Sequence, residues 1–227
     1  MSIVNEVTPQ WLTRLQSLVQ SPELLPDRQR LRARYSPELA YGRHFSPPSP
    51  QAKPAAVMVM LHLPSINADW KEATIPLTVR PNHLPDHPGQ ISFPGGRVES
   101  GEDHLQAAVR EFEEELGVKH FPGTLVDQLQ PIWVFNSDYW LVPFLSVHLG
   151  PIEYQPCDYE VARLIHMPVR ELLHSDDRNQ GNYSRGSVQW RANAFRCGED
   201  LVWGATGIVL GDLAAILREM ASQEDRL

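Results

Sequence analysis

One segment constrains the fold more than any other: a glycine-rich loop that leads into a strongly acidic helix. The spacing predicts a helix over residues 103–116. At about 100° per residue its apolar side chains share one face, and Glu111, Glu114 and Glu115 gather on the opposite face. The apolar face must pack on another layer of the protein, so the chain has to supply a core beside this helix.

The carboxylate cluster has two interpretations. It is either a solvated acidic face or a cation-binding site, since like charges one turn apart repel. A helix that serves only solubility would include lysine, whereas this helix has none and its one arginine is Arg110. Gly95, Gly96 and Gly101 permit a tight loop that brings Glu102 toward the helix start. Clustered carboxylate oxygens suit Mg²⁺ or Mn²⁺ better than Zn²⁺, and both interpretations stay open at this point.

Strands and helices alternate along the rest of the chain. Apolar runs predict buried strands, further helices are expected near Pro168 and around residues 210–217, and the strands are placed at 57–61, 133–135, 141–145 and 161–165. This mixture indicates an α/β layered domain over residues 55–227. The proline-rich segment 46–54 is predicted to be a linker, and residues 1–45 a helical appendage that docks on the domain.

The composition of the chain limits the kinds of partner that it can bind. The chain has 227 residues and a net charge of −8, which argues against broad binding to nucleic acid or an anionic membrane, since such binding depends on clustered lysine and arginine. No apolar run approaches the roughly 20 residues of a membrane helix, and no secretory signal is visible at the N-terminus. Two cysteines, Cys157 and Cys197, cannot build a disulfide framework. We therefore expect a cytoplasmic location.

The loop and the helix together resemble the signature of the Nudix hydrolases, G-x5-E-x7-R-E-U-x-E-E-x-G-U, in which U is a bulky apolar residue. All nine restricted positions match, namely Gly96, Glu102, Arg110, Glu111, Phe112, Glu114, Glu115, Gly117 and Val118. The resemblance implies an α/β/α sandwich with a mixed sheet. It also implies hydrolysis of a nucleoside diphosphate linked to another group, with Mg²⁺ or Mn²⁺ as cofactor.

The same resemblance assigns roles to residues. It implies that Glu111, Glu114 and Glu115 bind the metal, that one of these carboxylates can act as base, and that Arg110 orients a carboxylate by ion pairing. Gly95, Gly96 and Glu102 would shape the loop. Members of this family often place a further glutamate in the site from a later loop, and Glu160 is the candidate here; Glu153 and Asp158 compete with it.

An upstream segment is similar to the added signature of the coenzyme A pyrophosphatase branch. Leu77-Thr78-Val79-Arg80, Gly89 and Phe93-Pro94-Gly95-Gly96 match it in spacing, whereas Pro76, Pro81 and Pro85 depart from it. Pro85 stands where a second arginine would offer a charge to substrate phosphate. The candidate substrate-binding residues are Arg80, His83, His87 and Arg97. By this resemblance the products would be 3′,5′-ADP and 4′-phosphopantetheine.

Two alternatives remain. The first is a Nudix hydrolase of another small nucleotide, such as ADP-ribose, NADH or a dinucleoside polyphosphate. The second is a Nudix-fold sensor that binds a nucleotide without cleaving it, although the intact carboxylates Glu111, Glu114 and Glu115 argue against loss of activity. We expect a small-molecule nucleotide substrate and no nucleic-acid or membrane partner, and the sequence leaves a homodimer open.

Overall fold

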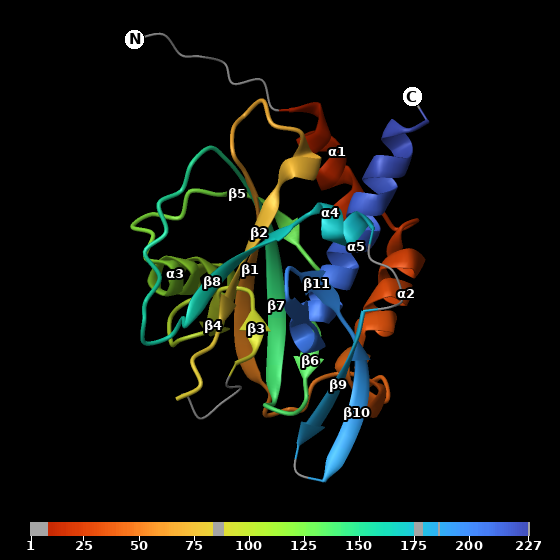
Figure 1. Ribbon diagram of the computed structural model, residues 1–227, viewed down its shortest axis with the longest axis vertical. Coiled ribbons are helices and arrows are strands. Elements are labelled where there is room, and N and C mark those ends of the chain that lie inside the picture. The colour runs from red at the N-terminus through yellow and green to blue at the C-terminus, as the bar shows by residue number, and fades with distance from the viewer. Residues whose placement is uncertain (1–8, 84–88, 175–178, 186, 227) are drawn as a thin grey trace.

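The structure is a computed structural model, and it describes residues 9–83, 89–174, 179–185 and 187–226 (Figure 1). Its helices are α1 Gln10–Val19, α2 Leu25–Tyr35, α3 His104–Leu116, α4 Arg170–Leu173 and α5 Gly204–Glu224. Its strands are β1 Lys53–Leu63, β2 Thr74–Val79, β3 Ile91–Ser92, β4 Gly95–Arg97, β5 Thr124–Gln128, β6 Ile132–Val134, β7 Tyr139–Leu149, β8 Arg163–Pro168, β9 Gln180–Arg185, β10 Val188–Asn193, β11 Phe195–Cys197 and β12 Asp200–Val202. Among the described residues, no helix has both the length and the apolar composition needed to cross a membrane.

A mixed sheet forms the centre of the molecule. Its main path runs β3-β2-β1-β7-β5, while β4 pairs with β1, β6 with β7 and β8 with β2. Strands β1 and β7 run parallel and stay in register from Lys53 opposite Tyr139 to Leu63 opposite Leu149. The other pairs of this sheet are antiparallel. A long parallel pair therefore forms the spine, and shorter antiparallel strands extend it on both sides.

The alternating side chains of β1 define two layers. Ala56, Met58 and Met60 point to one face and pack with Phe112 and Leu116 of α3. The intervening residues of β1 point to the other face and join the larger core that includes α5, namely Val57, Val59, Leu61 and Leu63. Figure 1 shows α3 on one side of the sheet and α5 with α2 and α1 on the other. The expected α/β/α sandwich with a mixed sheet is confirmed.

The N-terminal helices belong to the larger of these two cores. Leu15 of α1 and Leu31 and Tyr35 of α2 are buried in the same cluster as Leu213 of α5. Helices α1 and α2 lie along α5 in Figure 1. The segment predicted to be a docked appendage thus supplies buried apolar surface to the face of the sheet that α3 does not cover.

Two predicted boundaries differ from the structure. Strand β1 begins at Lys53, so the last two residues of the predicted linker 46–54 belong to the sheet; Lys53 N–H donates to Asp138 O, and Pro54 pairs with Trp140. Pro54 is tolerated because it lies near the end of the strand, where a missing donor costs little. The strand predicted at 161–165 begins at Arg163, since the N–H of Val161 donates to Cys157 O in a turn.

Candidate active site

Helix α3 is held by caps at both ends, which set the direction of its acidic side chains. At the N-terminus Asp103 and Gln106 exchange hydrogen bonds in a capping box. At the C-terminus Gly117 has φ 63°, the left-handed conformation that favours glycine. Phe112 and Leu116 are completely buried against the sheet. The helix therefore cannot rotate about its axis without exposing this apolar face.

The three predicted metal-binding glutamates differ in exposure. The side chain of Glu114 is 58% exposed and that of Glu111 is 17% exposed. Glu115 is only 6% exposed, because it lies at the border between the helix and the sheet, where Thr78 Oγ1 of β2 donates to its Oε2 at 3.4 Å. The expectation of a single acidic face opposite the apolar face is thus wrong for Glu115. The burial of the three carboxylates instead increases from the exposed Glu114 through Glu111 to Glu115, which lies against the sheet.

Arg110 links the carboxylates to the glycine loop. Its guanidinium donates to both oxygens of Glu102, at 3.1 and 2.8 Å, and to one oxygen each of Glu111 and Glu114, at 2.9 and 3.0 Å. A further bond at 3.1 Å reaches the carbonyl of Arg97 in β4. All five donors of the guanidinium are therefore used. Arg110 lowers the pKa of Glu102, whose Oε1 also accepts from the N–H of Glu99.

Gly96 is required by the approach of Glu111 to the loop. It lies in β4 opposite Ala56 of β1, and a Cβ atom at this position would collide with the Glu111 carboxylate. The adjacent Gly95 approaches the backbone of β1 so closely that a Cβ there would meet the carbonyl of Ala56. The two glycines expected to shape the loop thus lie where the loop, the sheet and helix α3 come together.

Burial and mutual repulsion control the charge of the inner carboxylates. Burial raises the pKa of Glu115 to about 8, and the nearby Glu111 and Glu160 add to the effect, whereas Arg80 opposes it. Burial also raises the pKa of Glu111, against the influence of Arg110. The charged form of both carboxylates is thus less favoured than in an exposed glutamate, and a further cation beside them would favour it. Their donor chemistry fits a divalent ion, since carboxylate oxygens are hard ligands.

No three His, Cys, Asp or Glu side chains converge on one point within the part of the chain that the structure describes. Arg110 binds one oxygen of Glu111 and one of Glu114, so the second oxygen of each lies outside the hydrogen bonds of this arginine. An ion would be bound through such oxygens or after a change of rotamer.

Glu160 reaches the carboxylates from a turn that is attached to α3. The N–H of Cys157 donates to Glu115 O at 3.0 Å, and the N–H of Glu160 donates to Cys157 O at 3.0 Å. Glu160 is exposed, and its charge acts on both Glu111 and Glu115. The structure therefore places this residue near the carboxylates, and its part in the reaction stays a prediction. Both competing candidates, Glu153 and Asp158, are exposed in the same segment between β7 and β8.

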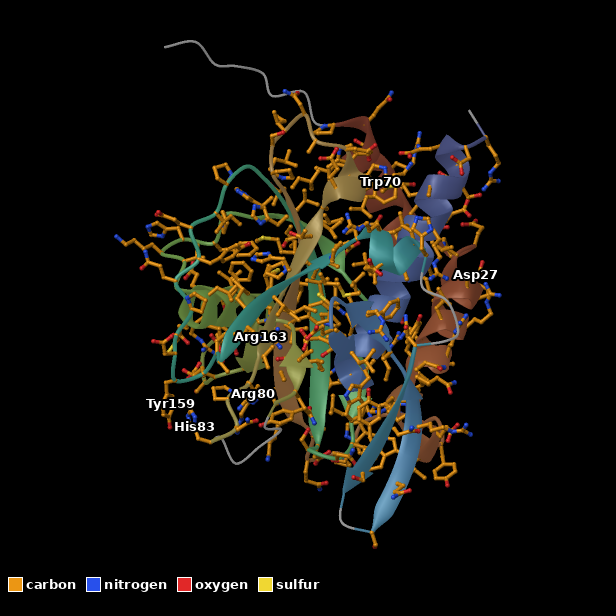
Figure 2. All side chains as sticks on the ribbon, viewed as in Figure 1. Asp27, Trp70, Arg80, His83, Tyr159 and Arg163 are labelled. Carbon is orange, nitrogen blue, oxygen red and sulfur yellow. The ribbon has the colours of Figure 1, made fainter. Side chains whose placement is uncertain are left out.

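The described residues at the base of the predicted substrate loop lie near the same carboxylates. Arg80 closes its base, since Arg80 N–H donates to Gln90 O at 3.0 Å and Gly89 N–H donates to Arg80 O at 3.1 Å. Its charge acts on Glu115, as described above. His83 contacts the ring of Tyr159, which precedes Glu160 in the chain (Figure 2). His87 and Pro85 lie outside the described residues.

Three further residues near the site differ in how far the sequence predicts their contacts. Arg97 serves the site through its backbone carbonyl, and its own side chain is exposed. Thr78, which belongs to the motif quoted above, bonds Glu115; this contact follows from strand geometry that the sequence does not predict. Tyr159 was not expected at the site, and no motif in the sequence indicates it.

A group of carboxylates with an arginine, Arg80, near them fits an enzyme that acts on phosphate groups with divalent ions. The NUDIX domain family matches residues 67–185, just over half of the chain, so the chain belongs to the Nudix family. Its members are pyrophosphohydrolases of small nucleotide substrates and use divalent metal ions. The matched region includes the whole predicted signature and Glu160, whereas α1, α2 and α5 lie outside it.

Known proteins resemble the chain as follows. It is 33% identical over 152 residues to an uncharacterized Nudix hydrolase, NudL, of Yersinia pestis, a match that covers 63% of this chain and 72% of the relative. Among solved structures, the Nudix hydrolase RenU of M. smegmatis is 18% identical with a TM-score of 0.48 and covers 76% of this chain and 87% of that chain. A MutT/nudix family protein of Enterococcus faecalis is 14% identical with a TM-score of 0.48 and covers 93% and 76%.

Proposed function

We propose that the protein hydrolyses the diphosphate of coenzyme A or its derivatives to 3′,5′-ADP and 4′-phosphopantetheine. The observation that carries this proposal is the position of Arg80. It belongs to the segment that is similar to the coenzyme A pyrophosphatase branch, and its charge acts directly on Glu115. Arg80 at the base of the loop offers positive charge to a diphosphate. The carboxylates on α3 offer negative charge to the metal ion that accompanies it.

The metal-binding residues of the proposal are Glu111, Glu114 and Glu115, with Mg²⁺ or Mn²⁺ as the ion. When bound, such an ion neutralises charge on the diphosphate and lowers the pKa of a water molecule. The chain itself contributes orientation: Arg110 keeps Glu111, Glu114 and Glu102 in a fixed relation through four hydrogen bonds. In this proposal Glu160, exposed beside Glu111 and Glu115, accepts the proton of the attacking water.

Substrate contacts in the proposal come from the loop that follows β2. Arg80 pairs with a phosphate oxygen, while His83, His87 and Arg97 supply further donors around the phosphates. Pro85 lacks the charge of the arginine that the branch signature has there, so Arg80 carries more of the phosphate binding in this chain than two arginines would.

The test is steady-state hydrolysis of coenzyme A beside ADP-ribose, NADH and a dinucleoside polyphosphate, each with Mg²⁺ and with Mn²⁺, with products identified by mass. A preference for coenzyme A supports the proposal. A preference for another substrate overturns the specificity and keeps the hydrolase. Absence of turnover on the whole panel favours the nucleotide sensor.

Helix α3 provides a matched pair of variants for the metal site. Glu114→Gln should abolish turnover, since a neutral amide is a poor ligand for Mg²⁺. Glu113→Gln is the control, because Glu113 stands at the unrestricted position of the signature and accepts from the N–H of Phe121 instead. If both variants retain activity, the assignment of the metal site is wrong.

Location and assembly complete the proposal. We propose that the enzyme acts in the cytoplasm and assembles as a homodimer. Cell fractionation with an antibody to the protein tests the location. Light scattering on the purified chain tests the dimer, and a mass of one copy at all concentrations excludes it.

A further inference from the structure

An aromatic side chain lies in solvent at the edge of the site without a part in the mechanism above. Tyr159 is 67% exposed, and it immediately precedes Glu160. A tyrosine ring of this exposure forgoes much of the free energy that burial would supply. Such a residue is common on a surface when it stands alone. Tyr159 does not stand alone, since His83 contacts its ring from a different part of the chain.

The two rings come from two anchored loops. The turn with Tyr159 is held to α3 by the bond from Cys157 N–H to Glu115 O. His83 follows Arg80, whose backbone closes the loop between β2 and β3 through two hydrogen bonds. Figure 2 shows Tyr159 and His83 next to each other at the same edge of the molecule as Arg80. The turn that carries Glu160 and the loop that carries Arg80 thus each contribute one ring to this pair.

The geometry of the pair decides where a ligand would lie. The ring centroids are 5.4 Å apart and the planes are inclined by 51°. A flat ring between them would need a stacking contact on each of its faces, each commonly about 4.5–7 Å between centroids, so the pair cannot hold a ligand in its middle. His83 instead supports one side of Tyr159, and the exposed part of the tyrosine ring is the surface on which another ring can stack.

We propose that Tyr159, supported by His83, stacks the base of the nucleotide half of the substrate. This inference rests on the proposed function only in requiring a nucleotide whose diphosphate lies at the carboxylates. A single ribose separates the base of a nucleotide from its 5′-phosphates, and Tyr159 is one residue from Glu160. Stacking uses the face of the base and no hydrogen-bond readout, so purines should bind better than pyrimidines through their larger area.

Calorimetric binding to the full chain at fixed Mg²⁺ tests the proposal without turnover. The probes are ADP, CDP and inorganic pyrophosphate, which has no base. Tyr159→Ala should weaken ADP binding about 5- to 20-fold, the lower part of the range for loss of one base stack, and weaken CDP binding less. It should leave pyrophosphate binding and the melting temperature unchanged, because the side chain is exposed.

Two matched variants complete the design. Tyr159→Phe keeps the ring and should bind ADP as the unmodified chain does. Tyr41→Ala removes another exposed tyrosine, 80% exposed and located between α2 and β1, and should change nothing. The proposal is overturned if Tyr159→Ala binds ADP normally, if pyrophosphate binding falls equally, if Tyr159→Phe loses as much affinity as Tyr159→Ala, or if the unmodified chain binds no ADP.

Kinetics separate this inference from the substrate assignment. With whichever nucleotide the enzyme cleaves, Tyr159→Ala should raise KM and leave kcat nearly unchanged, because the ring contacts the base and not the reacting phosphate. If coenzyme A is not cleaved but ADP binding depends on Tyr159, the substrate assignment fails and the stacking site stands. If coenzyme A is cleaved with an unchanged KM in Tyr159→Ala, the stacking site fails alone.

Discussion

Arg28 of α2 and Asp212 of α5 form a buried, two-bond ion pair. Arg28 Nε donates to Asp212 Oδ1 at 2.7 Å, and Nη2 donates to Oδ2 at 2.9 Å. Arg28 also donates to the carbonyl of Val19 at the end of α1, and Asp212 accepts from the N–H of Gln130. The pair therefore connects three helices and the segment before β6 at one point in the core that lies opposite α3.

Removal of one partner of this pair should strongly destabilise the protein. Arg28→Ala leaves Asp212 charged and buried, and we expect a loss of about 3–5 kcal/mol in the free energy of unfolding. Arg30→Ala is the control: Arg30 pairs with Asp27 at 2.8 Å, both side chains are exposed, and the expected loss is below about 1 kcal/mol. Urea unfolding measures both. Equal losses would contradict the structural role assigned to Arg28.

Arg110→Lys should reduce activity although the charge is kept. Lysine has three donors on one atom and cannot reproduce the two bonds to Glu102 together with those to Glu111 and Glu114. We expect Mn²⁺ affinity or kcat/KM to fall about 10- to 100-fold, the usual effect when a residue that orients metal ligands is lost. Paramagnetic titration with Mn²⁺ measures the affinity. A variant with unchanged Mn²⁺ binding and activity would show that charge alone suffices.

Two glycines of the signature loop should respond differently to alanine. Gly96→Ala places a methyl group on the Glu111 carboxylate, so activity should be lost while the fold is retained. Gly101 has φ 94° and open space around it, so Gly101→Ala should cost about 1–2 kcal/mol of stability and leave the carboxylates in place. Circular dichroism and turnover of both proteins separate the effects. If Gly96→Ala is fully active, Glu111 can move away without consequence.

Glu160→Gln should lower kcat about 10²- to 10⁴-fold if this residue accepts the proton from water. The fold should be unaffected, because Glu160 is exposed. Glu153→Gln is the matched control from the same loop, and its activity should equal that of the unmodified chain. Loss of activity in the second variant but not in the first would transfer the assignment to Glu153.

Acid stability should depend on His44. Burial lowers the pKa of this residue from its ordinary value of 6.5, despite a bond of 2.9 Å between Nδ1 and Trp133 O. Below pH 6.5 the unfolded chain therefore binds a proton that the folded chain resists, and stability falls as the pH falls, by up to about 1.4 kcal/mol per pH unit. His44→Gln removes this contribution, while the other titrating groups are common to both proteins. Urea unfolding between pH 7 and pH 5 should show a shallower decline for the variant, and parallel declines would refute the assignment.

The helical period was sufficient to place Glu111, Glu114 and Glu115 near one another, because α3 is a regular element with caps in the local sequence. It could not predict that Glu115 is buried. That depends on Thr78 in β2, a strand that the pattern misses because Pro76 interrupts its apolar run. In the sheet Pro76 lies opposite His166 of β8, so the proline is accommodated by a pairing between distant segments.

The sequence pattern does not predict the hairpin β9–β10, for a related reason. Its residues are mostly polar, so the alternation typical of a half-buried strand is weak. Tyr183 stacks on Trp203, which precedes α5, with ring centroids 3.8 Å apart. This contact joins residues that are 20 positions apart in the chain. Local patterns contain no information on such contacts.

The parallel pair β1–β7 bears on where insertions and deletions can be tolerated in such an enzyme. The segment between them, residues 64–138, leaves β1 at Leu63 and enters β7 at Tyr139, the opposite end of the pair, and it contains the loop between β2 and β3 as well as α3. The entropy lost in closing a segment grows by only about 0.6 kcal/mol for each doubling of its length. Residues can therefore be inserted or deleted between β2 and β3 while the spine remains intact. New substrate preferences can therefore arise in that loop at little cost in stability.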